Sequence, residues 1–299
     1  MSARLILATL ILIIFVSGSA QIFAKGSSSN MDSQVGSSQD TALGEPSQAR
    51  NKKLIIDQIM AESGIDEMIE QLPAMVAMGF DQQPPPPINR DKFMRFRGDL
   101  LQAFDPVNIR QTVADYFNKH YEEKQFSELL TLLKNPLAQK MTDLELEVST
   151  PQAQQEMMQM GNIIMGQALP SRLEVVQKLD EATNSTELMV DMQVTIASTI
   201  MKNMNKIVPQ AQHKTEEQFD QILEQIRLQS LFPIRQFMHL SMVYTYRSVG
   251  DEELNEYIQL YQSDIGRWFI ELMNNAWMKM SEEVFIDLAA LMEKNFVEQ

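Results

Sequence analysis

Apolar residues recur every three to four positions along most of this chain, which is the spacing of a helix with one buried face. The interruption at Ser63-Gly64 separates two such stripes. Together they consist of Leu54, Ile55, Ile59, Ile65, Met68, Ile69, Leu72 and Val76. A third stripe consists of Phe93, Phe96, Leu100, Leu101 and Phe104. No segment shows the alternation of a strand, so the pattern predicts an all-α fold.

Helix starts are marked by capping residues placed directly before proline. Asp105-Pro106, Asn135-Pro136 and Thr150-Pro151 each combine a side chain that accepts backbone hydrogen bonds with a proline at the first helical position. Thr215 to Gln218 reads as a capping box, and Ser263-Asp264 as a further start. These signals predict helices that begin at about 106, 136, 151, 216 and 264.

The helical pattern repeats along the chain at an offset of 120 residues. This offset places Glu67 on Glu187, and it matches the apolar residues of the two stretches in order. The apolar pairs are Ile55–Val175, Ile56–Val176, Ile59–Leu179, Met68–Leu188, Ile69–Met189, Leu72–Met192 and Val76–Ile196. Such self-similarity at a fixed spacing is typical of tandem duplication.

From Phe104 onward, the residues of the two copies match at an offset of 128 instead of 120. It places Glu128 on Glu256, and it pairs Phe104–Phe232, Tyr116–Tyr244, Phe126–Leu254, Leu132–Leu260, Leu137–Ile265, Met141–Phe269 and Met157–Phe285. The change of offset falls between 82–87 in one copy and 203–214 in the other, and both stretches read as loops, where insertions are tolerated. We therefore predict two duplicated helical units, 52–168 and 171–297, packed into one elongated body.

The centre of each copy has a distinctive motif. Copy one contains Asn135-Pro136 and Ala138, and copy two contains Tyr261, Ser263 and Gly266. These stretches resemble a bacterial family of exported helical proteins, the domain of unknown function 2059. Its hallmark is a helix that ends in an aromatic pair, followed by Ser-Pro-x-Gly and a basic residue.

Each copy departs from this hallmark. Leu132-Leu133 replaces the aromatic pair and Ala138 the glycine in copy one, and Asp264 replaces the proline in copy two. The resemblance implies export and a helical fold, and it implies no activity. In physical terms, Asn or Ser caps a helix and the small residue allows two helices to approach closely.

The N-terminus has the features of an export signal. One basic residue, Arg4, precedes an apolar run from Leu5 to Val16, and Gly18 and Ala20 suit the −3 and −1 positions of a cleavage site. We expect cleavage after Ala20, with a second candidate site after Ala24. The alternative is an uncleaved membrane anchor, because 5–24 is about long enough to span a bilayer.

Residues 21–51 are rich in Ser, Gly, Gln and Asp, which predicts a low-complexity, flexible tether. The short Gln82 to Pro87 stretch reads as a stiff connector or, alternatively, as a docking ligand. Signal and tether together predict a location in the periplasm of a bacterial envelope.

Composition excludes several classes of function. The chain of 299 residues has no cysteine, so it has no disulfide, thiolate metal site or cysteine nucleophile. Its net charge of −15 argues against a nucleic-acid partner, since phosphate binding depends on Lys and Arg.

Candidate catalytic residues are few. His120, His213 and His239 form no metal-binding or nucleophile motif. Four acidic clusters occur, and we predict that they lie at helix starts, where acids complement the helix dipole. They are Glu122-Glu123, Glu216-Glu217, Asp251-Glu252-Glu253 and Glu282-Glu283. We therefore expect no enzyme, no cofactor and no resident metal, with a carboxylate enzyme as one alternative.

Methionine is unusually frequent, at 22 residues. Three interpretations compete: filling of helical cores, a thioether-lined surface that binds varied apolar segments, and capture of Cu(I). The candidate partner-binding residues are Met157, Met158, Met160, Met238, Met242 and Met273. The sequence favours a non-enzymatic, chaperone- or adaptor-like envelope protein that binds proteins or peptides, with copper handling as the second alternative.

Overall fold

The computed structural model describes residues 47–81, 90–207 and 213–297. The signal and nearly all of the tether therefore lie outside the described residues, as does the proline stretch. The described residues contain helices and no strand, so the predicted all-α fold class is confirmed.

Within residues 47–81, 90–207 and 213–297, seven helices make up the first part of the chain and five the second. The first seven are α2 (Ser47–Glu62), α3 (Ile65–Asp81), α4 (Arg90–Ala103), α5 (Pro106–Lys119), α6 (Glu123–Leu133), α7 (Pro136–Val148) and α8 (Pro151–Gln167). The next five are α9 (Pro170–Thr183), α10 (Ser185–Ile207), α11 (Glu216–Thr245), α12 (Asp251–Gln262) and α13 (Asp264–Val297). Helix α2 begins inside the stretch predicted to be tether.

The predicted helix starts are confirmed. The side chain of Asp105 accepts hydrogen bonds from Val107 N and Asn108 N, and Asn135 and Thr150 cap α7 and α8 in the same way. Thr215 and Gln218 form the predicted capping box at α11. These caps depend only on residues within one turn, which is why the sequence predicts them well.

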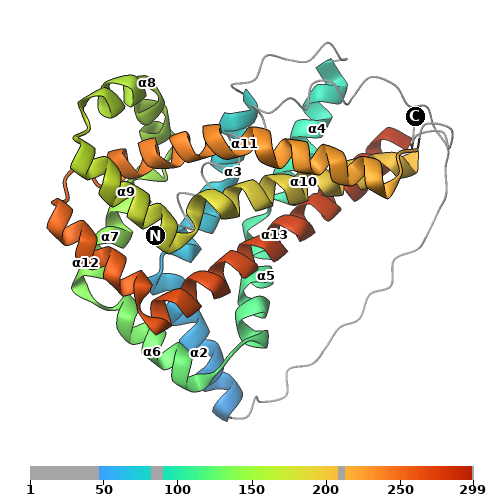
Figure 1. The fold of residues 1–299 in the computed structure, drawn as a ribbon. Coiled ribbons are helices and arrows are strands. Elements are labelled where there is room, and N and C mark those ends of the chain that lie inside the picture. Colours follow the sequence, from blue (N-terminus) through green and yellow to red (C-terminus); the bar gives the residue numbers. More distant parts are fainter. Residues whose placement is uncertain (1–46, 82–89, 208–212, 298–299) are drawn as a thin grey trace.

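Helix α13 is the central element of the fold. It packs against α4, α5 and α6 on one side and against α9, α10 and α12 on the other. Figure 1 shows it crossing the molecule beside α10, with α11 beyond. Trp277 of α13 is fully buried in the single apolar core that unites these helices.

Most of the predicted stripe residues are buried, including Ile59, Met68, Leu72, Leu100 and Phe104. Ile55, Phe93, Phe96 and Leu101 are half-buried, and Leu54 is exposed on α2. Ion pairs reinforce the first helices: Arg110 Nε lies 2.9 Å from Asp66 Oδ1 of α3, and Arg110 Nη2 lies 3.0 Å from Asp57 Oδ1 of α2.

Candidate functional site

Four of the six candidate methionines lie in the core. Met157, Met238, Met242 and Met273 are buried. Their side chains pack among other apolar residues and present no surface to a partner in this conformation. Met158 and Met160 are exposed, at 51% and 47%. The candidate surface is thereby reduced to these two residues of α8.

The helical geometry of α8 also limits metal binding by its methionines. Successive residues of an α-helix are rotated by roughly 100°, so Met158 and Met160 point about 200° apart. Met157 lies on the same side as Met160 but is buried. The three thioethers therefore do not converge on one ion. The described residues also hold no group of His, Asp or Glu side chains arranged to bind a metal.

Exposed apolar side chains occur on α8 and α11, two helices that pack against each other, although Met158 and Met160 point to different sides of α8. Besides the two methionines, these are Ile163 on α8, Leu169 just beyond it, and Leu228 and Phe232 on α11. Six of the ten large apolar side chains exposed in the described structure belong to this set. We call Met158, Met160, Ile163, Leu169, Leu228 and Phe232 the α8–α11 apolar set. Leu228 and Phe232 are not among the binding residues predicted from the sequence.

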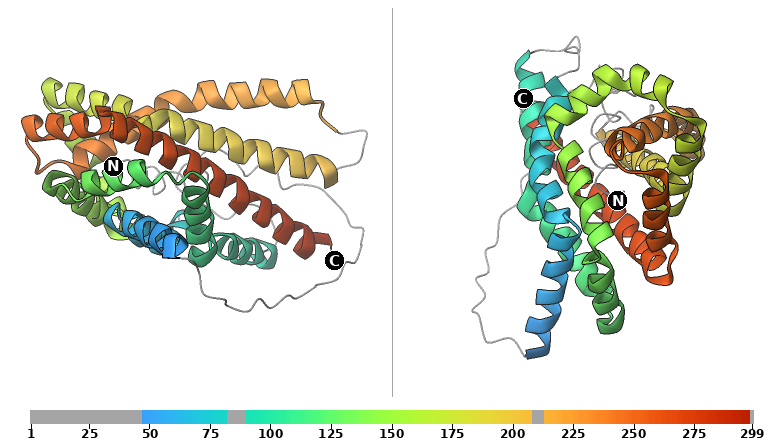
Figure 2. Two further views of the ribbon diagram at one scale, coloured as in Figure 1. Left: turned by 90° about the horizontal axis from the view of Figure 1, so that it is seen from below. Right: turned by 90° about the vertical axis from the view of Figure 1, so that its left-hand side faces the viewer.

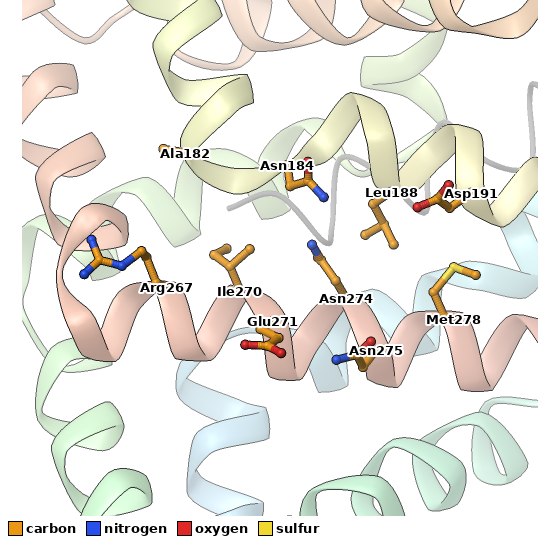
Figure 3. A pocket seen from close by; sticks show the side chains of 10 residues that line it. All are labelled: Ala182, Asn184, Leu188, Asp191, Arg267, Ile270, Glu271, Asn274, Asn275 and Met278. Atoms are coloured by element: carbon orange, nitrogen blue, oxygen red, sulfur yellow. The ribbon is translucent and has the colours of Figure 1, made fainter. Parts of the chain in front are cut away.

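A groove of about 430 Å³ lies between the α9–α10 junction and α13. Figure 3 shows Asn184 and Asn274 pointing toward one another across it, with Arg267 at one end and Met278 at the other. Ala182, Leu188, Asp191, Ile270, Glu271 and Asn275 complete the lining. All of these residues belong to the predicted second unit.

Two of the three charged residues that line this groove, Asp191 and Arg267, form ion pairs. Arg227 of α11 pairs with Asp191, and Arg267 pairs with Asp264 at the start of its own helix. The lining is therefore a mixture of amides, charged groups and aliphatic side chains. Nothing in it resembles a nucleophile with an adjacent base.

Three carboxylates of the described structure are buried away from this groove, and they are Glu145, Asp180 and Asp99. Glu145 of α7 accepts hydrogen bonds from the hydroxyls of Tyr246 and Tyr257, at 2.6 and 2.9 Å, and Tyr257 shares a 2.8 Å hydrogen bond with Tyr261. Burial, followed by the nearby charge of Glu145, raises the pKa of Tyr257 well above its usual value. The cluster connects α7 to α11 and α12 through hydrogen bonds in the core.

Asp180 is the second buried carboxylate. Its Oδ2 lies 3.3 Å from Nε2 of His239, and it accepts hydrogen bonds from the backbone N and hydroxyl of Thr186 at 2.8 and 2.6 Å. Burial by itself raises the pKa of Asp180, but these hydrogen bonds outweigh burial and lower the pKa below its ordinary value. The hydrogen bonds between Asp180 of α9 and Thr186 of α10 fix the turn between these two helices.

The acidic clusters are placed largely as predicted. Glu123, Glu216, Glu217 and the run Asp251–Glu253 lie in the first turns of their helices. The prediction for Glu282-Glu283 is wrong, because α13 continues through this position without a break. There Glu283 accepts a 2.6 Å hydrogen bond from Thr112 of α5, and both acids pair with Lys279.

Comparison with protein families, characterised proteins and solved structures finds no match to this chain. Within the part that the structure describes, no helix is both long enough and apolar enough to cross a bilayer.

Proposed function

We propose that this chain is a non-enzymatic exported protein of the periplasm that binds segments of other proteins. The observation that carries this proposal is the exposure of Leu228 and Phe232, which lie one turn apart on α11 within the α8–α11 apolar set. Large exposed apolar side chains that gather on one part of a surface are typical of interaction sites. Methionine suits such a site because its flexible thioether adapts to varied partners.

The binding role is tested by aggregation of an unfolded client protein, followed by light scattering. Replacing Met160, Leu228 and Phe232 by Gln removes apolar surface from the proposed site, and we expect most of the protection of the client to be lost. The matched control replaces Leu54, Met94 and Val107 by Gln, three apolar side chains that are equally exposed on α2, α4 and α5. If both triple variants protect the client equally, the proposal is wrong.

We further propose that 52–168 and 171–297 arose by duplication, in line with the resemblance to the exported family. Helix boundaries support this. Helices α3 and α10 begin 120 residues apart, at Ile65 and Ser185, and α6 and α12 begin 128 apart, at Glu123 and Asp251. Likewise α7 and α13 begin 128 apart. Helix α11 spans the positions of both α4 and α5, and α13 spans those of both α7 and α8.

Backbone geometry supports the same proposal. Among the described residues, those with a left-handed backbone are Gly64 and Asn184, with φ of 63° and 52°, and they lie 120 residues apart. The preceding hydroxyls correspond as well: Ser63 donates to Met60 O and Thr183 donates to Asp180 O, each at 3.3 Å. A turn of one type thus recurs at matching positions.

The two units exchange their C-terminal helices. Helix α13 of the second unit packs on α4, α5 and α6 of the first, while α7 and α8 of the first pack on α11 of the second. Such reciprocal packing is typical of a domain-swapped dimer, and joining its two copies in one chain would give this arrangement.

A further inference from the structure

The N-terminal half of α11 has a covered counterpart in the other unit. At the offset of 128, Leu228 corresponds to Leu100 and Phe232 to Phe104. Leu100 and Phe104 are 2% and 1% exposed, whereas Leu228 and Phe232 are 66% and 68% exposed. The same residue types are thus buried in one unit and open in the other.

In the first unit the covering element is the C-terminal half of α13. Its Phe285 packs edge-on against Phe104, with ring centroids 6.1 Å apart, and Val284 and Leu288 of the same stripe are buried. The hydrogen bond from Thr112 to Glu283 fixes its register along α5. The covered face with Leu100 and Phe104 therefore binds an amphipathic helix within the molecule itself.

Helix α8 is the counterpart of this covering helix, but it lies elsewhere along α11. At the offset of 128, Thr112 corresponds to Leu240 and Glu283 corresponds to Gln155. If the two units packed alike, Leu240 would therefore lie beside Gln155. Instead Leu240 lies against Gly161, where an added Cβ would be 2.9 Å from Leu240 Cδ2. A shift of six residues moves α8 by about 9 Å toward the C-terminal half of α11.

The cause of this displacement is a break in the helix. Pro151 ends the helical path of α7 and starts α8 in a new direction, while α13 continues straight through the corresponding Lys279. The N-terminal half of α11 is left paired with α10, at the edge of the molecule (Figure 2, left).

The charge of this open face differs from that of its covered counterpart. Helix α4 has four basic and two acidic residues, and the α13 segment that covers it has four acidic and two basic residues. The N-terminal half of α11 has four acids, and its two nearest arginines, Arg227 and Arg235, already face Asp191 and Glu187 of α10. Glu217 and Glu224 lie on the same helix face as Leu228 and are exposed.

We propose that this face, formed by Glu217, Glu224, Leu228 and Phe232, is the docking site for a cationic amphipathic helix of another protein. The stripe of the incoming helix covers Leu228 and Phe232 as Val284, Phe285 and Leu288 cover α4. Its Lys or Arg residues face the two glutamates. This inference rests on the proposed function and names the class of segment that is bound.

The chain itself supplies the probe. A peptide of residues 279–297 with Glu282, Glu283, Asp287 and Glu293 replaced by Lys keeps the apolar stripe and reverses the charge. We expect it to bind the mature protein at a 1:1 ratio in calorimetry or fluorescence anisotropy. The unmodified peptide and a scrambled lysine peptide should each bind at least about tenfold more weakly.

Variants of the protein localise the binding. Leu228→Ala with Phe232→Ala should weaken binding of the lysine peptide by about tenfold or more, because both side chains are lost from the contact. Leu54→Ala with Val107→Ala removes exposed apolar groups elsewhere and should leave affinity unchanged. Glu217→Lys with Glu224→Lys should reverse the preference to the unmodified peptide, whereas Glu252→Lys with Glu256→Lys, which changes the net charge equally, should not.

Three results would overturn the docking proposal: equal binding to both alanine variants, a stable dimer in solution that buries Phe232, or a rise in peptide affinity of more than tenfold on deleting residues 21–46. The second and third would mean that another copy or the chain's own N-terminal segment occupies the face. If protection of the client depends on Met158 and Met160 but not on Phe232, the proposed function is retained and the docking site on α11 is wrong.

Discussion

Gly266 makes the tightest backbone contact at the turn between α12 and α13. An added Cβ would lie 2.0 Å from Leu260 O and 2.7 Å from Tyr261 Cα, and both of these are backbone atoms that cannot rotate away. The backbone N of Gly266 also donates to Ser263 Oγ at 3.1 Å. The small residue in the motif is thus required by close approach of the chain.

We expect Gly266→Ala to lower the free energy of unfolding by about 2–3 kcal/mol, because the turn must open to admit the methyl group. Gly98→Ala is the matched control, since no atom lies within 4 Å of its added Cβ. That change should raise stability by about 0.5–1 kcal/mol by favouring helix. Urea unfolding measures both. Equal effects of the two substitutions would show that the contact at Gly266 is not tight.

Asp180 gives stability a dependence on acid. Because its folded pKa is lowered, the stabilisation is present above the unfolded carboxyl pKa of about 4 and is lost as pH falls through the folded pKa. The Asp180→Asn variant should therefore have a lower free energy of unfolding than the parent at pH 7, and this difference should narrow below about pH 4. A difference in the free energy of unfolding that stays constant from pH 7 to pH 3 would contradict the lowered pKa.

Residue-scale features were predictable from the sequence where they depend on near neighbours. The caps at Asp105, Asn135 and Thr150 are of this kind, and all were found. Burial is not, because it depends on which helix arrives from elsewhere in the chain. Leu100 and Leu228 have similar local sequence patterns, and only the path of α13 and α8 distinguishes them.

At the scale of elements, the Glu145 cluster connects α7 to α11 and α12 through tyrosine hydroxyls in the core. At the positions that correspond under the proposed duplication, Met273 and Leu129 are buried and apolar. The proposed equivalent of this polar contact is therefore apolar. The sequence offered no sign of this difference, since Glu145 reads as an ordinary exposed helix residue.

Tyr257 makes this cluster sensitive to base. Its raised folded pKa means that its contribution to stability is present below the unfolded pKa of about 10 and is lost as pH rises further. Tyr257→Phe should cost about 1 kcal/mol at pH 7 through the lost hydrogen bond, and the variant should then lose less stability than the parent between pH 9 and pH 11. Parallel pH profiles for parent and Tyr257→Phe would contradict the assignment.

Helix continuity was the least predictable property of the elements. The start of α13 at Ser263-Asp264 was predicted, but its 34-residue length was not, and so Glu282-Glu283 was assigned to a helix start. Helix α11 likewise continues through Pro233. In both cases tertiary packing keeps the helix continuous where local sequence signals favour a break.

For the whole molecule, the exchange of C-terminal helices predicts that neither unit folds alone. Residues 47–168 lack the α13 that covers α4–α6, and residues 169–299 lack α7 and α8. Separately, the fragments should show weak, non-cooperative thermal transitions by circular dichroism. Mixed at equal concentration, they should recover one cooperative transition. Independent, cooperative folding of either fragment would contradict the exchanged arrangement.

The central claim is that the open face of α11 binds other proteins in the cell envelope. The most direct measurement places a photo-reactive amino acid at Phe232, and separately at the exposed control position Val107, in the producing cells. After illumination, we predict adducts with other exported proteins from position 232 and few from position 107, with the cross-linked segments rich in Lys or Arg and apolar at helical spacing. No adducts from position 232, or the same adducts from both positions, would contradict the account.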